Sequence, residues 1–180
     1  MPSAATTPRF EYVREPAISE PLDAQLRELF SACFRKEFFR ERRYAYQMPL
    51  HRYLLTGDGG QVLAHVAVHE KRIGVGSEEL SVGGISEVCV HESLRGQGRA
   101  KELLDHAHRG LRERGFEFAM LFGDGPIYGS SGYLPLVAEI RRFDPTTQTF
   151  KSEPSAVARH KPLTDRAWPE GPIDIRGPMF

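Results

Sequence analysis

The stretch of sequence that decides the fold is Arg95-Gly96-Gln97-Gly98-Arg99-Ala100. It follows Ile85 to Val90, a short β-branched stretch with the composition of a buried strand. It precedes a segment with apolar residues at helical spacing, and Gly115 stands where that helix would need a left-handed C-terminal cap. The turn between strand and helix therefore points unpaired backbone N–H groups outward at a helix N-terminus, and such a site binds anions.

The composition of this turn indicates a phosphate ligand. Gly96 and Gly98 carry no side chain that would keep a phosphate from the backbone, while Arg95 and Arg99 can add charge-assisted contacts. The turn lacks the Gly-Lys-hydroxyl order of a Walker loop. A dinucleotide fingerprint that began at Gly96 would need a glycine where Lys101 stands.

The pattern that fits is Arg/Gln-x-x-Gly-x-Gly/Ala, with Arg95, Gly98 and Ala100 at the defined positions. On this motif the chain resembles the GCN5-related N-acetyltransferase (GNAT) superfamily, whose members hold the pyrophosphate of acyl-CoA in this way. The resemblance covers about residues 10–143. It implies acetyl-CoA as the co-substrate, and no metal. The residues expected to bind it are Val88, Cys89, Val90, Arg95, Gly96, Gln97, Gly98, Arg99 and Ala100.

A second element follows in the family's order. After a strand predicted from Phe116 to Phe122, Tyr128 precedes the pair Gly132-Tyr133 by four residues, as in the family. Asp124 suits the N-cap of a short helix, Pro126 its first turn and Gly132 its C-terminal cap. The resemblance implies that the Tyr128 hydroxyl lies near the thioester sulfur and protonates the departing thiolate. The alternative is that Tyr128 is an ordinary core aromatic.

The hydrophobic pattern of the whole chain predicts an α/β (α+β) fold, and the resemblance makes it the GNAT fold, with a mixed, mostly antiparallel central sheet and flanking helices. A helix is expected to open at Ser19 and Pro21. Strands are expected at residues 9–14, 51–56, 61–73 and 80–91. We expect a single domain over residues 1–180, in which residues 144–180 form a last strand, near 157–163, and an irregular proline-rich strap.

The length, charge balance and cysteine count of the chain limit the classes of function that it can have. With 180 residues, 40% of them hydrophobic, the chain can bury about 70% of its unfolded surface as one small enzyme. Its 24 basic and 24 acidic residues give no global field to recruit nucleic acid or membrane. No apolar segment has signal-peptide or membrane-spanning character, so we expect a cytoplasmic protein, and a homodimer is compatible with the sequence. Its 2 cysteines form neither a disulfide framework nor a zinc-ligand spacing.

Acyl transfer to an amine needs a base, because an amine with a pKa near 10 is protonated at neutral pH. The carboxylate nearest to the predicted cofactor strand is Glu87. In related members the glutamate of this strand can stand one residue earlier, where this chain has Ser86. Strand alternation puts Glu87 on the face opposite Val88, unless a bulge changes the register. A structural ion pair or an exposed carboxylate is the alternative role for Glu87.

Three further segments each allow two interpretations of their role. Glu87, Cys89 and His91 could form a nucleophile with its base and orienter, although a buried cysteine is favoured at Cys89. Residues 34–44 are predicted as an amphipathic helix with a solvated basic face, or as a wall that selects an anionic or aromatic acceptor. The tail at residues 168–180 is predicted as a strap over the core. It also resembles the ends of aminoglycoside 2'-N-acetyltransferases and nodulation N-acyltransferases, which would place the Phe180 carboxylate in the acceptor pocket.

The function expected from these features is acetyl-CoA-dependent N-acetyl transfer to a primary amine of a small molecule, by direct transfer in a ternary complex. An aminoglycoside is one alternative acceptor, and a protein or peptide amine is another. The alternative of a different class is a non-catalytic acyl-CoA-binding module.

Overall fold

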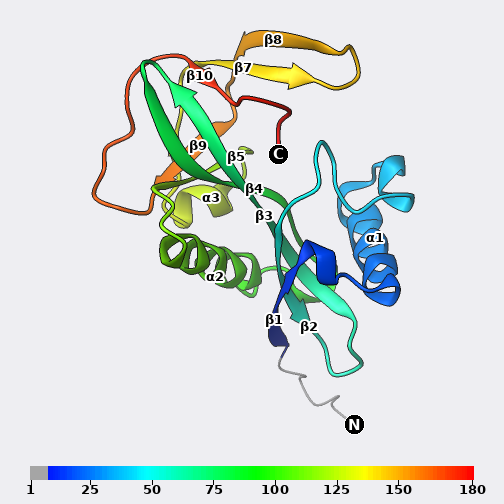
Figure 1. Ribbon diagram of the computed structural model, residues 1–180. Coiled ribbons are helices and arrows are strands. Elements are labelled where there is room, and N and C mark those ends of the chain that lie inside the picture. The colour runs from blue at the N-terminus through cyan, green and yellow to red at the C-terminus, as the bar shows by residue number, and fades with distance from the viewer. Residues whose placement is uncertain (1–7) are drawn as a thin grey trace.

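A computed structural model describes residues 8–180 of the chain, so residues 1–7 of the predicted domain lie outside the described part (Figure 1). Ten strands in this part form one sheet, whose main path has the order β6-β9-β5-β4-β3-β10-β7-β8, with β2 on β3 and β1 on β2. The helices are α1 (Glu20–Phe34), α2 (Arg99–Glu113) and α3 (Pro126–Ser130), with short 3-10 turns η1 (Glu15–Ala17), η2 (Glu37–Arg40) and η3 (Glu92–Leu94). The strands are β1 (Arg9–Arg14), β2 (His51–Thr56), β3 (Val62–Val75), β4 (Glu78–Val90), β5 (Phe118–Phe122), β6 (Leu134–Pro135), β7 (Glu139–Asp144), β8 (Thr149–Pro154), β9 (Ala158–Pro162) and β10 (Ile173–Asp174).

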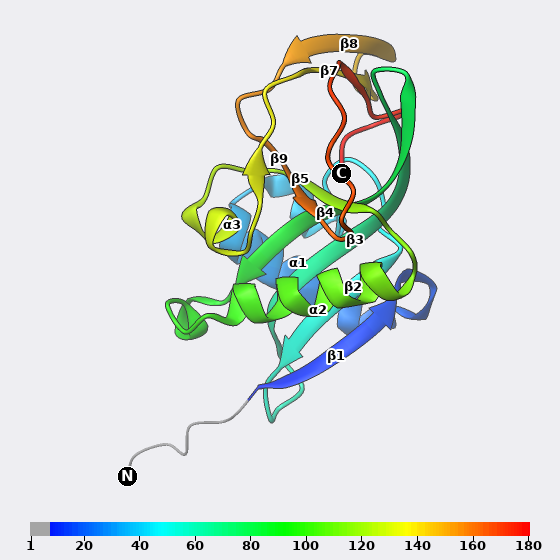
Figure 2. The same cartoon turned by 90° about the vertical axis from the view of Figure 1, so that its left-hand side faces the viewer.

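Helices α1 and α2 cover opposite faces of the sheet (Figures 1 and 2). The Ser19 side chain caps α1 by accepting from the N–H of Leu22, as the sequence predicted. The apolar stripe of α1 packs on β2 and on Cys89 of β4, whereas that of α2 packs on the other face of β2, β3 and β5. Gly115 follows the end of α2 with a φ of +79°, which is the predicted left-handed position.

The central hairpin of β3 and β4 positions the site, because each strand changes partner along its length. Strand β3 pairs with β2 near its start and with β10 at its end. Strand β4 pairs in parallel with β5 only from Val82 to Ile85. Beyond Ile85 the two strands diverge, and β4 continues to Val90 paired with β3 alone in the described part of the chain.

The region after Phe143 is more regular than the sequence predicted. Residues 144–180 contain β8 and β10 as well as the predicted strand near 157–163, which is β9. The prolines do not break β8, because Pro145 lies in the turn before it and Pro154 ends it on the edge of the sheet, where no ladder hydrogen bond is lost. The tail then returns across the sheet and packs Trp168 on Phe118, with ring centroids 4.9 Å apart. That the chain forms a single domain stays a prediction.

Two local predictions are wrong. Residues 34–44 do not form an amphipathic helix, because α1 ends at Phe34 and only the one-turn η2 follows. The N-cap of α3 is Gly125 rather than Asp124, and no side chain caps it. Gly132, with a φ of +84°, occupies the left-handed position after α3 that the sequence predicted.

Candidate active site

A groove of about 380 Å³ lies at the N-terminus of α2. Gly96 and Gly98 line it with φ angles of +73° and +75°, and a Cβ atom added to either would meet no atom within 4 Å. Gly98 is the N-cap of α2, so the first N–H groups of the helix have no intrahelical partner and face the groove. The groove brings together all but one of the predicted cofactor residues: Val88, Cys89, Val90, Arg95, Gly96, Gly98, Arg99 and Ala100.

The exception is Gln97, whose side-chain amide donates to the Ser93 carbonyl at 3.0 Å instead. The two arginines of the turn differ in their exposure and in their hydrogen-bond partners. Arg95 is exposed and donates from Nε to the Val90 carbonyl at 3.2 Å. Arg99 is paired with Glu102 at 2.8 Å, while its buried Nε has no hydrogen-bond partner among the described residues.

A bulge in β4 places Glu87. Glu87 and Val88 together lie opposite Val66 of β3, and Glu87 has a φ of +43°, in the left-handed region. The simple alternation is therefore broken, and Glu87 and Val88 both line the same pocket. The carbonyl oxygen of Glu87 points into the protein, where it accepts from Nδ1 of His65 at 2.8 Å.

A buried network, which the sequence did not reveal, holds this bulge. Arg52 is fully buried and donates from Nε to Glu15 at 2.6 Å and from Nη1 to Nε2 of His65 at 3.1 Å. Arg43 donates to the other carboxylate oxygen of Glu15 at 2.7 Å. Because Nε2 of His65 accepts, the proton of the neutral ring lies on Nδ1 and reaches Glu87. Burial and the charge of Arg52 lower the pKa of His65 well below its usual value, which keeps the ring neutral.

The Glu87 carboxylate is held by two donors from different elements. The backbone N–H of Ala45 donates to Oε1 at 3.0 Å, and the Ser86 hydroxyl donates to Oε2 at 2.7 Å. His69 contacts the same hydroxyl from Nε2 at 2.8 Å, and burial lowers the pKa of His69 to about 3, so the neutral ring donates there. Glu87 is only 8% exposed, and burial raises the pKa of its carboxyl against the lowering effect of these hydrogen bonds.

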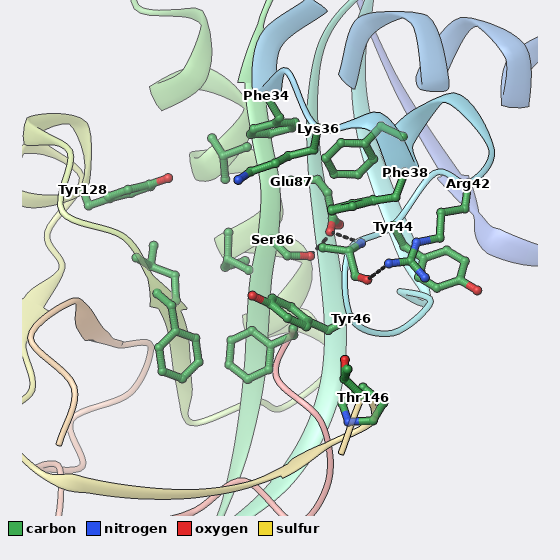
Figure 3. Close-up of a pocket in the computed structure, with 18 residues that line it drawn as sticks. Phe34, Lys36, Phe38, Arg42, Tyr44, Tyr46, Ser86, Glu87, Tyr128 and Thr146 are labelled. Carbon is green, nitrogen blue, oxygen red and sulfur yellow. Dashed lines mark hydrogen bonds between the residues drawn. The ribbon is translucent and has the colours of Figure 1, made fainter. Parts of the chain in front are cut away.

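A larger pocket of about 810 Å³ is drawn in Figure 3. It shares the lining residues Val88 and Tyr128 with the groove. Residues 34–46 contribute one wall of it, and Ser86, Glu87 and Phe180 also line it. Phe180 packs so closely on β4 that a Cβ atom at Gly84 would lie 2.6 Å from its ring.

Tyr128 lies on α3 and points its hydroxyl toward the centre of this pocket (Figure 3). Its ring packs edge-on against Tyr133, with centroids 6.1 Å apart. Gly123 makes room for it, because a Cβ atom there would approach the Tyr128 ring to 2.7 Å. Burial raises the pKa of Tyr128, and the negative charge of Asp124 adds to the shift, so the phenol stays protonated at neutral pH.

Cys89 does not have the surroundings of a nucleophile. It is buried against the apolar side of α1, as expected, and burial raises the pKa of its thiol well above the usual value. Within residues 8–180 no hydrogen bond joins it to Glu87 or His91, and His91 bonds Ser93 at 2.8 Å. The more acidic thiol is Cys33 on α1, which donates to the Val90 carbonyl at 3.6 Å, and the neighbouring Cys89 side chain lowers its pKa to about 6.

Comparison with known proteins identifies the class of this chain. A family model described as the acetyltransferase (GNAT) domain matches residues 19–136. The chain therefore belongs to the GNAT family of N-acetyltransferases, and the resemblance, the fold class and the enzyme class predicted from the sequence are confirmed.

Similar proteins are found in Escherichia coli and Brucella melitensis. An uncharacterised N-acetyltransferase of Escherichia coli, YhbS, is 29% identical over 121 residues, which cover 67% of this chain and 71% of that protein. The crystal structure of Escherichia coli YhbS in complex with CoA matches with a TM-score of 0.66 at 21% identity, and covers 96% of this chain and 92% of that chain. A GNAT family acetyltransferase from Brucella melitensis, in complex with acetyl-CoA, matches with a TM-score of 0.60 at 19% identity, and covers 92% of this chain and 94% of that chain.

We also searched residues 8–180 for membrane-spanning helices and for metal-binding groups. Each helix in this range is too short or too polar to span a bilayer. Over the same range, no group of three or more His, Cys, Asp or Glu side chains could hold a metal ion.

Proposed function

We propose that this enzyme transfers the acetyl group of acetyl-CoA to the primary amine of a small molecule, by direct transfer while both substrates are bound. The observation that carries the proposal is the meeting of the groove and the larger pocket at Val88 and Tyr128. A thioester that enters from the groove and an amine that enters from the pocket reach the same point. The Glu87 carboxyl opens into the pocket beside that point.

The groove suits acetyl-CoA in two ways. The free N–H groups at the start of α2 and the open space at Gly96 and Gly98 suit a pyrophosphate. The edge of β4 that diverges from β5 offers unpaired backbone groups near Val88 and Cys89, and these suit the amides of an extended pantetheine arm. The complexes of Escherichia coli YhbS with CoA and of the Brucella melitensis enzyme with acetyl-CoA support this assignment.

Glu87 is the proposed general base, acting through a water molecule. The amine must lose a proton before its nitrogen attacks the carbonyl carbon. The buried Glu87 carboxyl, whose pKa is raised, accepts a proton more readily than an exposed carboxylate does. The hydrogen bonds from Ala45 and Ser86 hold this carboxylate in the lining of the pocket. As negative charge develops on the thioester oxygen, a backbone N–H of the free β4 edge would stabilise it.

Tyr128 is the proposed general acid, which gives its proton to the departing thiolate. Its raised pKa keeps the phenol protonated until the C–S bond breaks. A thiol has a pKa near 8.5 and is a moderate leaving group already, so the proton contributes less here than it would for an alkoxide. Holding both substrates in line contributes more of the rate.

Thiol release from acetyl-CoA, measured with a mixed panel of primary amines, tests this function. We expect release that depends on a small-molecule amine, with intersecting initial-rate lines for the two substrates. If thiol is released only with protein or peptide amines, the acceptor is a protein or peptide amine and not a small molecule. Tight acetyl-CoA binding without release for any amine would instead indicate a binding module.

A further inference from the structure

The walls of the larger pocket are aromatic on both sides. Residues 34–46 and the opposite side of the pocket contribute eight aromatic side chains: Phe34, Phe38, Phe39, Tyr44, Tyr46, Phe122, Tyr128 and Phe180. Flat apolar groups pack well between such walls, and a volume of about 810 Å³ lies in the range of small-molecule sites. The pocket therefore suits an acceptor with an aromatic body.

The charged residues of the pocket are two cations and one buried acid. Among the described side chains that line it, Lys36 and Arg42 are the cations and Glu87 is the single carboxylate. Both oxygens of Glu87 already accept hydrogen bonds. Lys36 forms no ion pair with residues 8–180, and its amine points into the pocket toward the side of Tyr128 (Figure 3). An aminoglycoside with several ammonium groups would meet two like charges, and the one side-chain carboxylate in the lining already accepts two hydrogen bonds.

Arg42 is held in place with most of its donors free. Its guanidinium carbon lies 4.7 Å from the ring centroid of Phe38 and 5.5 Å from that of Tyr44. One nitrogen, Nη2, donates to the carbonyl oxygen of Ala45 at 2.9 Å. The other N–H groups of the planar fork can pair with a carboxylate in the bidentate geometry that arginine favours.

Ala45 links this guanidinium to the proposed base. Its carbonyl oxygen accepts from Arg42, and its N–H donates to Oε1 of Glu87 at 3.0 Å (Figure 3). The anion-binding group and the proton-accepting group therefore flank a single residue. A ligand that presents an amine to Glu87 and a carboxylate to Arg42 must carry the two groups close together, and an amino acid does so on one carbon.

We propose that the acceptor is a free aromatic amino acid, a refinement that rests on the function proposed above. Its carboxylate pairs with Arg42, and the Lys36 amine adds positive charge on the side of Tyr128. Its ring packs among the aromatic walls, and its amine lies between Glu87 and the thioester. In the reaction the N–C bond of the amide forms and the C–S bond of the thioester breaks. The proton of the amine passes through water to Glu87, and the thiolate takes a proton from Tyr128. The products are an N-acetyl amino acid and CoA.

Three acceptors compared in the thiol-release assay test this substrate class: L-phenylalanine, phenethylamine, which has the same ring and amine without the carboxylate, and the aminoglycoside kanamycin. A charge-assisted pair predicts kcat/KM at least about tenfold higher for L-phenylalanine than for phenethylamine. Arg42→Gln and Lys36→Gln should each reduce that preference. Lys36→Gln should fold normally, because this exposed side chain forms no ion pair in the described part of the chain, so a changed preference in this variant would not result from misfolding. Arg40→Gln is the matched control, since Arg40 lies in the same segment but does not line the pocket.

Product binding gives a readout that does not depend on turnover. With CoA present, N-acetyl-L-phenylalanine should bind the wild type and Arg40→Gln alike in calorimetry, and bind Arg42→Gln and Lys36→Gln more weakly. Equal or faster acetylation of phenethylamine or kanamycin would overturn the aromatic amino acid while the acetyltransferase function stands. A preference for L-phenylalanine that survives both pocket substitutions would also overturn it. An enzyme that releases thiol with no amine at all would refute both proposals.

Discussion

Replacing Gly98 by alanine separates the two reasons for a glycine at the start of α2. The φ of +75° is one reason, because a residue with a Cβ atom loses about 1–2 kcal/mol in the left-handed region. The groove is the other, because the new methyl group would stand in open space where the proposed pyrophosphate lies. Gly115 offers a control at the opposite end of the same helix. Its φ is +79°, and a Cβ atom there also meets nothing within 4 Å.

Both variants should therefore lose similar stability, about 1–2 kcal/mol in the free energy of unfolding measured with urea. Only Gly98→Ala should lose affinity for CoA. We expect its Kd to rise about tenfold in calorimetry, which corresponds to about 1.4 kcal/mol, and the Kd of Gly115→Ala to stay within about twofold of the wild type. Unchanged CoA affinity in folded Gly98→Ala would refute the assignment of the groove. An equal loss in Gly115→Ala would show that helix strain, rather than the groove, controls binding.

Four further substitutions test the site. Tyr128→Phe should lower kcat by about 10- to 10³-fold with CoA affinity unchanged in calorimetry, whereas Tyr133→Phe, which loses only a buried hydrogen bond to His108, should lower the melting temperature and spare kcat. Glu87→Gln should lower kcat and abolish the rise of kcat with pH, because the base acts only above its raised pKa. The melting temperature of this variant at neutral pH should not fall, since the raised pKa shows that the charged form of Glu87 is disfavoured in the folded state. Cys89→Ala should stay active, and an acetyl adduct on Cys89 by mass spectrometry would contradict direct transfer. Phe180→Ala should raise the Michaelis constant of the acceptor with CoA affinity unchanged; a parallel loss of both with a lower melting temperature would leave the tail as a strap.

The elements that could be predicted from the sequence are those that local chemistry decides. The turn at residues 95–100 predicted the groove because positive-φ glycines and a helix start are properties of adjacent residues. Strand β2 and the start of α1 followed from hydrophobic period and from the Ser19 cap. The hairpin of β7 and β8 escaped prediction, because a proline at a turn or at the end of an edge strand has the same sequence appearance as one that breaks a strand.

The larger pocket could be predicted only in part. For residues 34–44, a wall of the acceptor pocket was one of two interpretations. Which of the two holds depends on how the chain runs after α1 rather than on the pattern of the segment itself. The buried Arg52 could not be predicted from its position in an apolar strand. Its ion pair with Glu15 joins residues 37 positions apart, which only the fold brings together.

The position of Glu87 shows how a departure from the family's pattern can be compensated. With Ser86 at the position where related members can carry the glutamate, the carboxyl comes from the next residue, which strand alternation alone would turn away from Val88. The bulge reverses that turn at the cost of a left-handed φ at a residue with a side chain, and His65, aligned by Arg52, holds the carbonyl that the bulge turns inward. The Ser86 hydroxyl then bonds the displaced carboxylate. The direction of the proposed base therefore depends on a neutral buried histidine of β3 and a buried arginine of β2, neither of which lines the pocket.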